Sequence, residues 1–457
     1  MKMKKNKIRV TSAVVSAIML ASSASAFAKF DAYNDSDGFT LGHYEAEVNQ
    51  EQRADTEKLY EQRPKNERQF ENLSRGLVAV PGENGTLVSW RFLGTDSNSL
   101  TYNLYCSGEK LNDKPITTTN FFHTGASTNA EYTFKEVENG EETGVEYTTT
   151  AWDKNYIGFK VTEREGYNID DGAVADLDGD GEYEILLRRV PSMDVNTRTS
   201  YPVIEAYKTD GTHMWTIDIG PNEINEVDIN FLAYDMDGDG KAEVIMRSFE
   251  GTTDGKGNTT GDTNGDGITD YSKSESNLAI FKDRQYIVST PEFLSIYDGE
   301  TGEETDRTDL KPSKEPLSDW SYRYSDTGRL TKRASHYLFG LAYLDGVTPS
   351  VVMVRGAWDN VRAAAWHIED GKFKEDWVHN TENKDDVNSI WGACNHNLVT
   401  VDVDFDGKDE ILSGPMAIDH DGSEMYAVKV YDNDGNAQKL AHGYAFDVAK
   451  TDPDFNG

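Results

Sequence analysis

Short β-branched and aromatic stretches, separated by Gly, Asn and Asp, form the first recognisable pattern of this chain. They occupy residues 77–80, 86–92, 101–105 and 147–152. Such stretches are typical of strands joined by tight turns. We therefore predict an all-β unit, a β-sandwich of the fibronectin or immunoglobulin kind, over residues 69–158.

A second pattern repeats from residue 174 onward. Asp-rich loops lead into short apolar strands at residues 185–187, 244–246 and 411–412, and hairpin turns occur at residues 207–211, 297–300, 369–371 and 431–435. Clear helical periodicity is absent. Repeated four-stranded units predict a β-propeller over residues 159–457, with roughly six blades at about 40–50 residues a blade. Residues 451–457 begin another Asp-rich loop without a strand behind it, so we expect the ring to be incomplete.

The Asp-rich loops share one arrangement of ligands. Residues 176–184, 235–243 and 402–410 carry oxygen side chains at positions 1, 3, 5 and 9 and Gly at position 6, and residues 262–270 are a looser copy. This is the spacing of a calcium loop, in which position 7 adds a backbone carbonyl. The predicted ligands are Asp176, Asp178, Asp180, Glu184, Asp235, Asp237, Asp239, Glu243, Asp262, Asn264, Asp266, Asp270, Asp402, Asp404, Asp406 and Glu410.

Several Ca²⁺ ions are therefore predicted, giving a calcium-stapled propeller in which metal holds the strand connections. We favour this structural role over direct catalysis. The loop at residues 262–270 has a rival interpretation, because single loops of this kind occur in cellulosomal docking modules. Those modules need two tandem copies, and the chain has one copy of this looser kind.

Charge and the first residues limit the partners and the compartment. The formal net charge is −36, which disfavours nucleic acid and anionic membranes as partners by repulsion. A basic start, a short apolar run and the Ala-Phe-Ala of residues 26–28 predict a secretory signal peptide over residues 1–28, and hence a secreted, extracellular protein. Residues 29–68 are predicted to be a polar arm or surface helix. Cys106 and Cys394 leave the question of a disulfide open.

Taken together, the sandwich and propeller patterns resemble the rhamnogalacturonan lyases of polysaccharide lyase family 11. The resemblance begins near residue 66 and covers most of the chain after it. The residues that carry it are 75–80, 89–96, 176–184, 234–243, 251–255, 343–346, 355–356, and 395–396 leading into 402–410.

The resemblance implies an eight-bladed propeller that binds several calcium ions. It implies endo-cleavage of the rhamnosyl–galacturonate backbone of pectin by β-elimination, with plant cell-wall rhamnogalacturonan I as the substrate. We also expect a monomer. Neutralising the uronate carboxylate with Ca²⁺, Arg or Lys stabilises the enediolate that forms when a base removes the C5 proton. The resemblance also marks Asp171, Asn395 and His396 as substrate-binding residues, and His396 and His442 as further metal ligands.

Several positions depart from the family pattern. Asp170 stands where the family has Asn, Val227 where it has His, and Asn360 where it has Arg. Tyr444 replaces an Asp after His442, Lys450 replaces another, and the family's catalytic Arg and Lys correspond to positions beyond residue 457. The catalytic residues are therefore not assigned.

Two hypotheses of function follow from this pattern. The first is a secreted, calcium-dependent rhamnogalacturonan endolyase. The second is a catalytically weakened or inactive member of the family, truncated or degenerate, that binds pectin through a calcium propeller. A third, an adhesion propeller, explains the repeated loops but not the signature at residues 75–96.

Overall fold

The computed structural model describes a defined part of the chain. It covers residues 58–59, 62–64, 67–125, 129–192, 200–223, 230–282, 284–321, 325–356, 360–381, 386, 388–394, 396–431 and 436–439. The predicted signal peptide, most of residues 29–68, Asn395 and His442 lie outside the described residues. Among the residues covered, no helix is long and apolar enough to cross a membrane.

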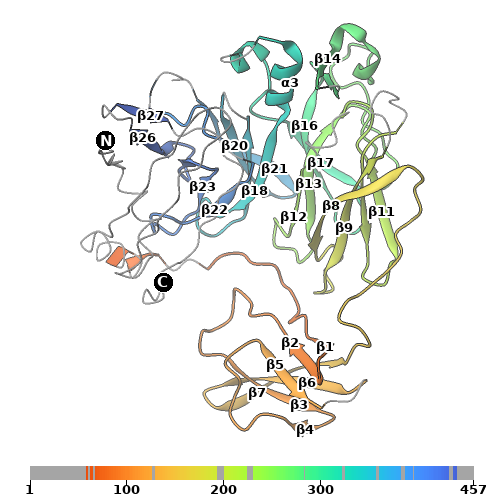
Figure 1. The fold of residues 1–457 in the computed structure, drawn as a ribbon, viewed down its shortest axis with the longest axis vertical. Coiled ribbons are helices and arrows are strands. Elements are labelled where there is room, and N and C mark those ends of the chain that lie inside the picture. The colour runs from red at the N-terminus through yellow and green to blue at the C-terminus, as the bar shows by residue number, and fades with distance from the viewer. Residues whose placement is uncertain are drawn as a thin grey trace, which may run out of the picture.

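Two antiparallel sheets form the N-terminal unit, drawn in orange in Figure 1. One sheet has the order β1 (Val78–Gly82), β2 (Gly85–Ser89), β5 (Asn120–Thr124), and the other has the order β4 (Glu109–Lys110), β3 (Thr101–Cys106), β6 (Glu131–Glu138), β7 (Glu141–Thr150). Side chains of both sheets share one core, in which Trp90 stacks on Phe134 with ring centroids 5.1 Å apart. The two sheets therefore pack face to face, as in a sandwich.

Four four-stranded antiparallel sheets follow, each a simple meander in chain order except where an insertion intervenes. The first holds β8 (Tyr167–Ala175), β9 (Glu184–Pro191), β10 (Val203–Tyr207) and β11 (His213–Asp218); the second β12 (Phe231–Tyr234), β13 (Glu243–Phe249), β16 (Glu292–Tyr297) and β17 (Glu304–Asp309); the third β18 (Tyr337–Ala342), β19 (Ser350–Arg355), β20 (Arg362–Glu369) and β21 (Lys372–Asn380); the fourth β22 (Val399–Val401), β23 (Glu410–Leu412), β24 (Met416–Ile418) and β25 (Glu424–Ala427). A hairpin of β26 (Lys429–Tyr431) and β27 (Ala437–Lys439) comes last.

Successive sheets bury apolar faces against one another. One core contains Leu186 and Val244 of the first and second sheets, a second contains Ile245 and Val351, and a third joins the third and fourth sheets. The opening strands β8, β12, β18 and β22 lie side by side in that order. The second strands β13, β19 and β23 are buried at nearly every position, which explains the short continuous apolar runs in the sequence there.

The predicted apolar strands and three of the four predicted turns are found in the structure, whereas residues 432–435 of the fourth turn lie outside the described residues. Residues 185–187, 244–246 and 411–412 lie in β9, β13 and β23, and the turns at 207–211, 297–300 and 369–371 join paired strands. The count of roughly six units is wrong for the described residues, which hold four such sheets and a hairpin. The described sheets need more residues each than we expected, because long connections join some of their strands.

Two connections contain structure that the sequence pattern did not predict. The connection from β13 to β16 holds η2 (Tyr271–Lys273), η3 (Glu275–Asn277) and the hairpin of β14 (Leu278–Phe281) and β15 (Arg284–Ile287). The connection from β17 to β18 holds η4 (Leu317–Trp320) and the helix α3 (Thr327–Ser335). The Asp326 side chain caps α3 by accepting a hydrogen bond from the Arg329 N–H at 3.0 Å. Both connections lie at the same end of their sheets (Figure 1).

The strap, residues 67–76, runs along the opposite end of the sheets before the chain enters β1 (Figure 1). Arg68 forms a bidentate ion pair with Asp409, at 2.8 and 3.2 Å. The Gln69 N–H donates to the Val347 carbonyl at 2.9 Å, and the Ser74 N–H donates to the Gly181 carbonyl at 2.9 Å. The Gln69 side chain also donates to the Asp235 carbonyl at 3.4 Å, so the strap connects all four sheets to the sandwich.

The two cysteines are both free. Cys106 lies in β3 of the sandwich, whereas Cys394 is buried between the third and fourth sheets. The disulfide that the sequence left open is therefore not formed.

Candidate metal loops and a polar cleft

Three of the Asp-rich loops fold into nearly identical structures between the first and second strands of a sheet. We call residues 176–184 loop 1, residues 235–243 loop 2, residues 262–270 loop 3 and residues 402–410 loop 4. In all four, the Gly N–H at position 6 donates to the Asp carboxylate at position 1, at 2.8 to 3.1 Å. In loops 1, 2 and 4 the position 9 Glu accepts the N–H of position 2, at 2.7 to 2.9 Å. The position 6 Gly has a positive φ in each loop, as the sharp turn requires.

Loops 1, 2 and 4 also bring their carboxylates together. Ligand oxygens lie within 4.8 Å of one another in three groups: Asp176, Asp178 and Asp180; Asp235, Asp237 and Asp239; and Asp402, Asp404 and Glu410. Burial is the main cause that raises the pKa of Asp176, Asp235 and Asp402, and it raises the pKa of Glu243 to about 8 and that of Glu410 to about 9. Buried carboxylates held this close favour a bound cation.

Unpartnered oxygens give a separate test of fit to a metal. Asp178 Oδ1, Asp402 Oδ1 and Glu410 Oε1 are buried and have no hydrogen-bond partner. Leaving such oxygens unsatisfied costs free energy that a hard cation offsets. The residues of loops 1 and 4 therefore fit Ca²⁺.

Loop 3 has the backbone of the others but not their surroundings. It is exposed, and Asp270 accepts a hydrogen bond from the Ser272 N–H at 3.1 Å and pairs with Lys273 at 2.9 Å. The Tyr271 hydroxyl, which donates to Asp266, lowers the pKa of that carboxyl. The three Asp of this loop are not among the close acidic groups found in the described residues. The carboxylate oxygens of Asp266 and Asp270 already accept hydrogen bonds within the protein, so loop 3 fits a cation less well than the other loops.

The opposite end of the sheets carries a polar cleft of about 920 Å³. Its lining comes from the β17–β18 connection, the start of β20, the end of β21 and Trp391. The hydrogen-bonding side chains there are Ser313, Ser318, Ser321, Asn360, Asn380 and Thr381. Asn360 is buried, and its Oδ1 has no hydrogen-bond partner.

Arg362 is the buried cation of this cleft. One guanidinium nitrogen donates to the Ser313 and Glu315 carbonyls, at 2.6 and 3.2 Å, and another pairs with Asp319. The guanidinium also lies 5.1 Å from the ring of Trp320, which is fully buried. The lining also carries the ammonium of Lys311 and the carboxylates of Glu315 and Asp319. Hydroxyl, amide and charged groups around one opening are suited to binding a polar ligand rich in hydrogen-bonding groups.

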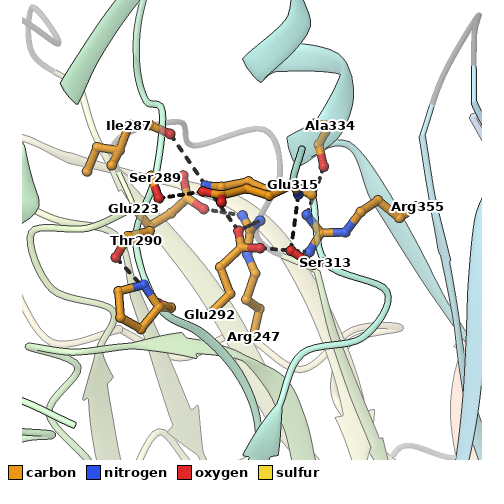
Figure 2. A network of polar contacts seen from close by, with 12 residues as sticks. Glu223, Arg247, Ile287, Ser289, Thr290, Glu292, Ser313, Glu315, Ala334 and Arg355 are labelled. Atoms are coloured by element: carbon orange, nitrogen blue, oxygen red, sulfur yellow. Dashed lines mark hydrogen bonds and ion pairs between the residues drawn. The ribbon is translucent and has the colours of Figure 1, made fainter. Parts of the chain in front are cut away.

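A buried charged network, the Glu292 network, includes Lys314, whose sequence neighbours Ser313 and Glu315 line the cleft. Figure 2 shows the guanidinium groups of Arg247 and Arg355 converging on Glu292. Glu292 contacts Arg355 at 3.0 Å, Arg247 at 3.3 Å and Lys314 at 3.5 Å, and Arg247 also pairs with Glu223. Burial alone would raise the pKa of Glu292, but Arg355, Lys314 and Arg247 hold it at about 2. A cavity of about 20 Å³ borders the network.

The predicted substrate residues lie apart from one another. Asp171 is exposed on β8 and lies 3.7 Å from Arg188, with which Asp170 also pairs. His396 is exposed, and its ring lies 5.2 Å from the ring of His336. The structure does not bring these two residues into the cleft lining, whereas the sequence did not single out Arg362, Asn380, Thr381 or Trp391. These four come from separate segments without a shared motif.

Comparison with known proteins shows the family. The model for the rhamnogalacturonan lyase family 11 C-terminal domain matches residues 158–457, and the model for the rhamnogalacturonan I lyase beta-sheet domain matches residues 68–152. Two Bacillus subtilis (strain 168) proteins, the rhamnogalacturonan endolyase YesW and the rhamnogalacturonan exolyase YesX, are each 37% identical to the chain, over 401 and 407 residues. The alignments cover 84% and 85% of this chain but 60% and 61% of the relatives.

Solved structures agree with this assignment. The crystal structures of YesX and YesW both align with a TM-score of 0.69 at 36% identity, covering 83% of this chain and 61% and 63% of theirs. The Bacillus licheniformis rhamnogalacturonan lyase PL11 gives the same identity and TM-score. The chain spans about three fifths of the length of the curated relatives, and it belongs to rhamnogalacturonan lyase family 11.

Proposed function

We propose that this chain cleaves the rhamnosyl–galacturonate backbone of rhamnogalacturonan I by calcium-dependent β-elimination. The observation that supports this most directly is the pair of family matches, which together span residues 68–457 with the sandwich unit before the repeated sheets. The cleft adds support, since its lining offers hydroxyl, amide and guanidinium groups.

The chain's own residues would bind and position the polymer. Asn380, Ser318 and Thr381 would hydrogen-bond sugar hydroxyls, and Arg362 would orient a uronate carboxylate. Carboxylate neutralisation by a cation makes the C5 proton removable, after which the bond to O4 breaks. The acidic groups of loops 1, 2 and 4 would hold Ca²⁺, which stabilises the folded state when bound.

We also propose that the four sheets are blades of a propeller. Their meander topology, the adjacency of their first strands and the apolar packing between successive sheets support this architecture. The same proposal assigns residues 69–158 to the sandwich and residues 159–457 to the propeller.

A lyase assay tests the function. Purified full-length chain is incubated with rhamnogalacturonan I and calcium, and the unsaturated uronate made by β-elimination is followed near about 235 nm. A rise in absorbance is expected, with polygalacturonan as the substrate control. No rise, together with retained polymer binding in a gel-retardation assay, would instead support the catalytically weakened pectin-binding protein, which the replacement of an Arg by Asn360 favours.

Separate measurements test the mode of cleavage, the secretion of the protein and its oligomeric state. An endolyase lowers the viscosity of the polymer early and releases fragments of mixed size, whereas an exolyase releases small products first; we propose the endo mode. Secretion predicts a mature N-terminus near residue 29 in the culture medium, and a monomer predicts a single-chain mass in size-exclusion chromatography with light scattering.

A further inference from the structure

An ion pair inside the polar cleft joins two side chains of unequal exposure. Asp319 of η4 and Arg362 of β20 both line the cleft, and their side chains pair with each other. The Asp319 side chain is 40% exposed, whereas that of Arg362 is 7% exposed. The cation is therefore built into the cleft wall, while its carboxylate partner remains accessible to solvent.

The guanidinium group of Arg362 uses its hydrogen-bond donors unevenly. Nη1 donates to the carbonyls of Ser313 and Glu315, and Nη2 donates to Asp319 Oδ2. Nε is buried and has no hydrogen-bond partner among the described residues. Nε and Nη2 lie along one edge of the planar guanidinium group, and this edge can hold a carboxylate through two parallel hydrogen bonds. Asp319 therefore fills only half of a fork that suits a whole carboxylate.

Arg362 and η4 are held in place by contacts that do not involve the Asp319 carboxylate. The two carbonyl hydrogen bonds at Nη1 fix the guanidinium group, which also lies 5.1 Å from the ring of Trp320. Trp320 is fully buried, packs against helix α3 and donates its indole N–H to the Lys314 carbonyl at 2.7 Å. Partly exposed ion pairs contribute little to stability, so the Asp319 side chain can turn toward solvent at small cost.

The free half of the fork indicates which ligand would replace Asp319. A uronate carboxylate offers two oxygens in one plane with a negative charge, whereas a neutral sugar offers hydroxyl groups alone. We propose that Asp319 occupies the place of a substrate carboxylate, and that a galacturonate binds by displacing it and accepting from both Nε and Nη2 of Arg362. The identity of this ligand rests on the proposed function. Asp319 would then act as a specificity residue, because a neutral sugar has no group with which to displace it.

Binding of a small acidic sugar to the full chain tests the displacement. The probe is the disaccharide in which galacturonate is linked to O2 of rhamnose, and its carboxyl-reduced form is the neutral control. The galacturonate of this probe has a free O4, so it has no bond for β-elimination to break. Ligand-observed NMR titration measures Kd. Asp319→Asn should lower the Kd of the acidic disaccharide roughly fivefold and leave that of the neutral form unchanged.

A matched variant separates displacement from a general change of charge. Glu315→Gln removes one negative charge from the same lining, but the Glu315 side chain accepts a hydrogen bond from Ser289 and makes no ion pair with Arg362. It should lower the Kd of the acidic disaccharide much less than Asp319→Asn does. Arg362→Lys keeps the positive charge and removes the fork, so Asp319→Asn should no longer tighten binding in that background.

Each variant is checked for its fold by circular dichroism and thermal unfolding, and Asp319→Ser serves as a second substitution. The proposal is overturned if Asp319→Asn binds the acidic disaccharide no more tightly than the parent chain, if Glu315→Gln gains as much, or if the neutral form gains equally. These outcomes are independent of cleavage. A chain that releases no unsaturated uronate can still show the Asp319 effect, and a chain that cleaves the polymer can lack it.

Discussion

Glu292 is the carboxylate whose loss should destabilise the four repeated sheets most clearly. Its side chain is 7% exposed and contacts three cations, of which Arg247 and Arg355 are 3% and 0% exposed. Replacing it in Glu292→Gln keeps the shape but leaves Arg247, Arg355 and Lys314 with Glu223 as their remaining carboxylate in the network. Uncompensated buried charge is the costly outcome when one partner of a buried pair is removed.

The magnitude follows from the pKa of Glu292. The value of about 2 lies roughly 2.5 units below the ordinary 4.5, and one unit corresponds to about 1.4 kcal/mol. The loss in Glu292→Gln should therefore be about 3 kcal/mol at pH 7, which agrees with the 3–5 kcal/mol typical of broken buried pairs. A depressed carboxyl pKa stabilises the fold above the unfolded pKa. The difference from the parent chain should therefore shrink as pH falls from about 5 toward 2.

Thermal unfolding followed by tryptophan fluorescence measures this loss. With calcium present, a loss of about 3 kcal/mol should lower the melting temperature by roughly 6–12 °C. The matched control is Glu315→Gln, because Glu315 is an exposed carboxylate of the cleft lining, next in sequence to Lys314, and accepts a hydrogen bond from the Ser289 hydroxyl. The double variant Glu292→Gln/Arg355→Gln should lose less than the sum of the single losses. A Glu292→Gln variant as stable as Glu315→Gln would refute the reasoning.

Three further changes test the metal loops and the cleft. Burial raises the pKa of Glu243 to about 8 and of Glu410 to about 9 in the metal-free protein, so calcium must displace protons at pH 7. Calorimetry should show affinity rising about tenfold per pH unit between pH 6 and 8, and the metal-free fold should lose stability as pH rises from about 4.5 through 8 to 9; a pH-independent affinity contradicts this. Lys208→Met removes the ammonium that pairs with loop 1 and should raise calcium affinity there roughly fivefold, whereas Lys241→Met should leave it unchanged; equal effects would count against the idea. Asn380→Ala should raise KM for the polymer roughly fivefold with kcat little changed, and an unaltered KM would exclude Asn380 from substrate binding.

Local spacing predicted the loops well because each loop is organised by contacts within nine residues. The position 6 N–H reaches the position 1 carboxylate whatever the rest of the fold does. The structure adds what spacing cannot show, namely that loop 3 is exposed and that Phe405 adopts φ +66° where the other loops have Gly. A bulky residue in that conformation is strained, and only its surroundings in the folded chain hold it there.

The sequence signature at residues 75–96 acquires a physical reason in the structure. Arg75 is buried and pairs with Asp96, at the far end of the signature, and with Glu136 of β6. These hydrogen bonds outweigh burial and raise the pKa of Arg75. The two ion pairs of Arg75 fix the segment that enters β1. This segment follows directly after Ser74, whose N–H donates to the Gly181 carbonyl of loop 1.

Contacts between distant segments could not be predicted from the chain alone. The Glu292 network joins β13, β16, β19 and the β17–β18 connection. The cleft likewise combines Ser313, Asn360 and Trp391, which share no motif. The sequence pattern did not predict the nine-residue helix α3, because a helical repeat over so few residues is too short to recognise. Packing of Leu330 and Ala334 near Trp320 holds the helix in place.

The positions of the loops and the cleft decide what bound calcium can contribute to chemistry. In the third sheet, Ala342 pairs with Ser350 at the loop end, and Tyr337 pairs with Arg355 at the cleft end. Five residue steps of about 3.4 Å separate the two ends by about 17 Å, roughly twice the Debye length of about 8 Å at physiological salt. A cation in loop 1, 2 or 4 is therefore too far away to neutralise a uronate in the cleft. Calcium at the loops would therefore act through the fold, and under the proposed function the charge on a uronate would have to be met by groups at the cleft end, such as Arg362.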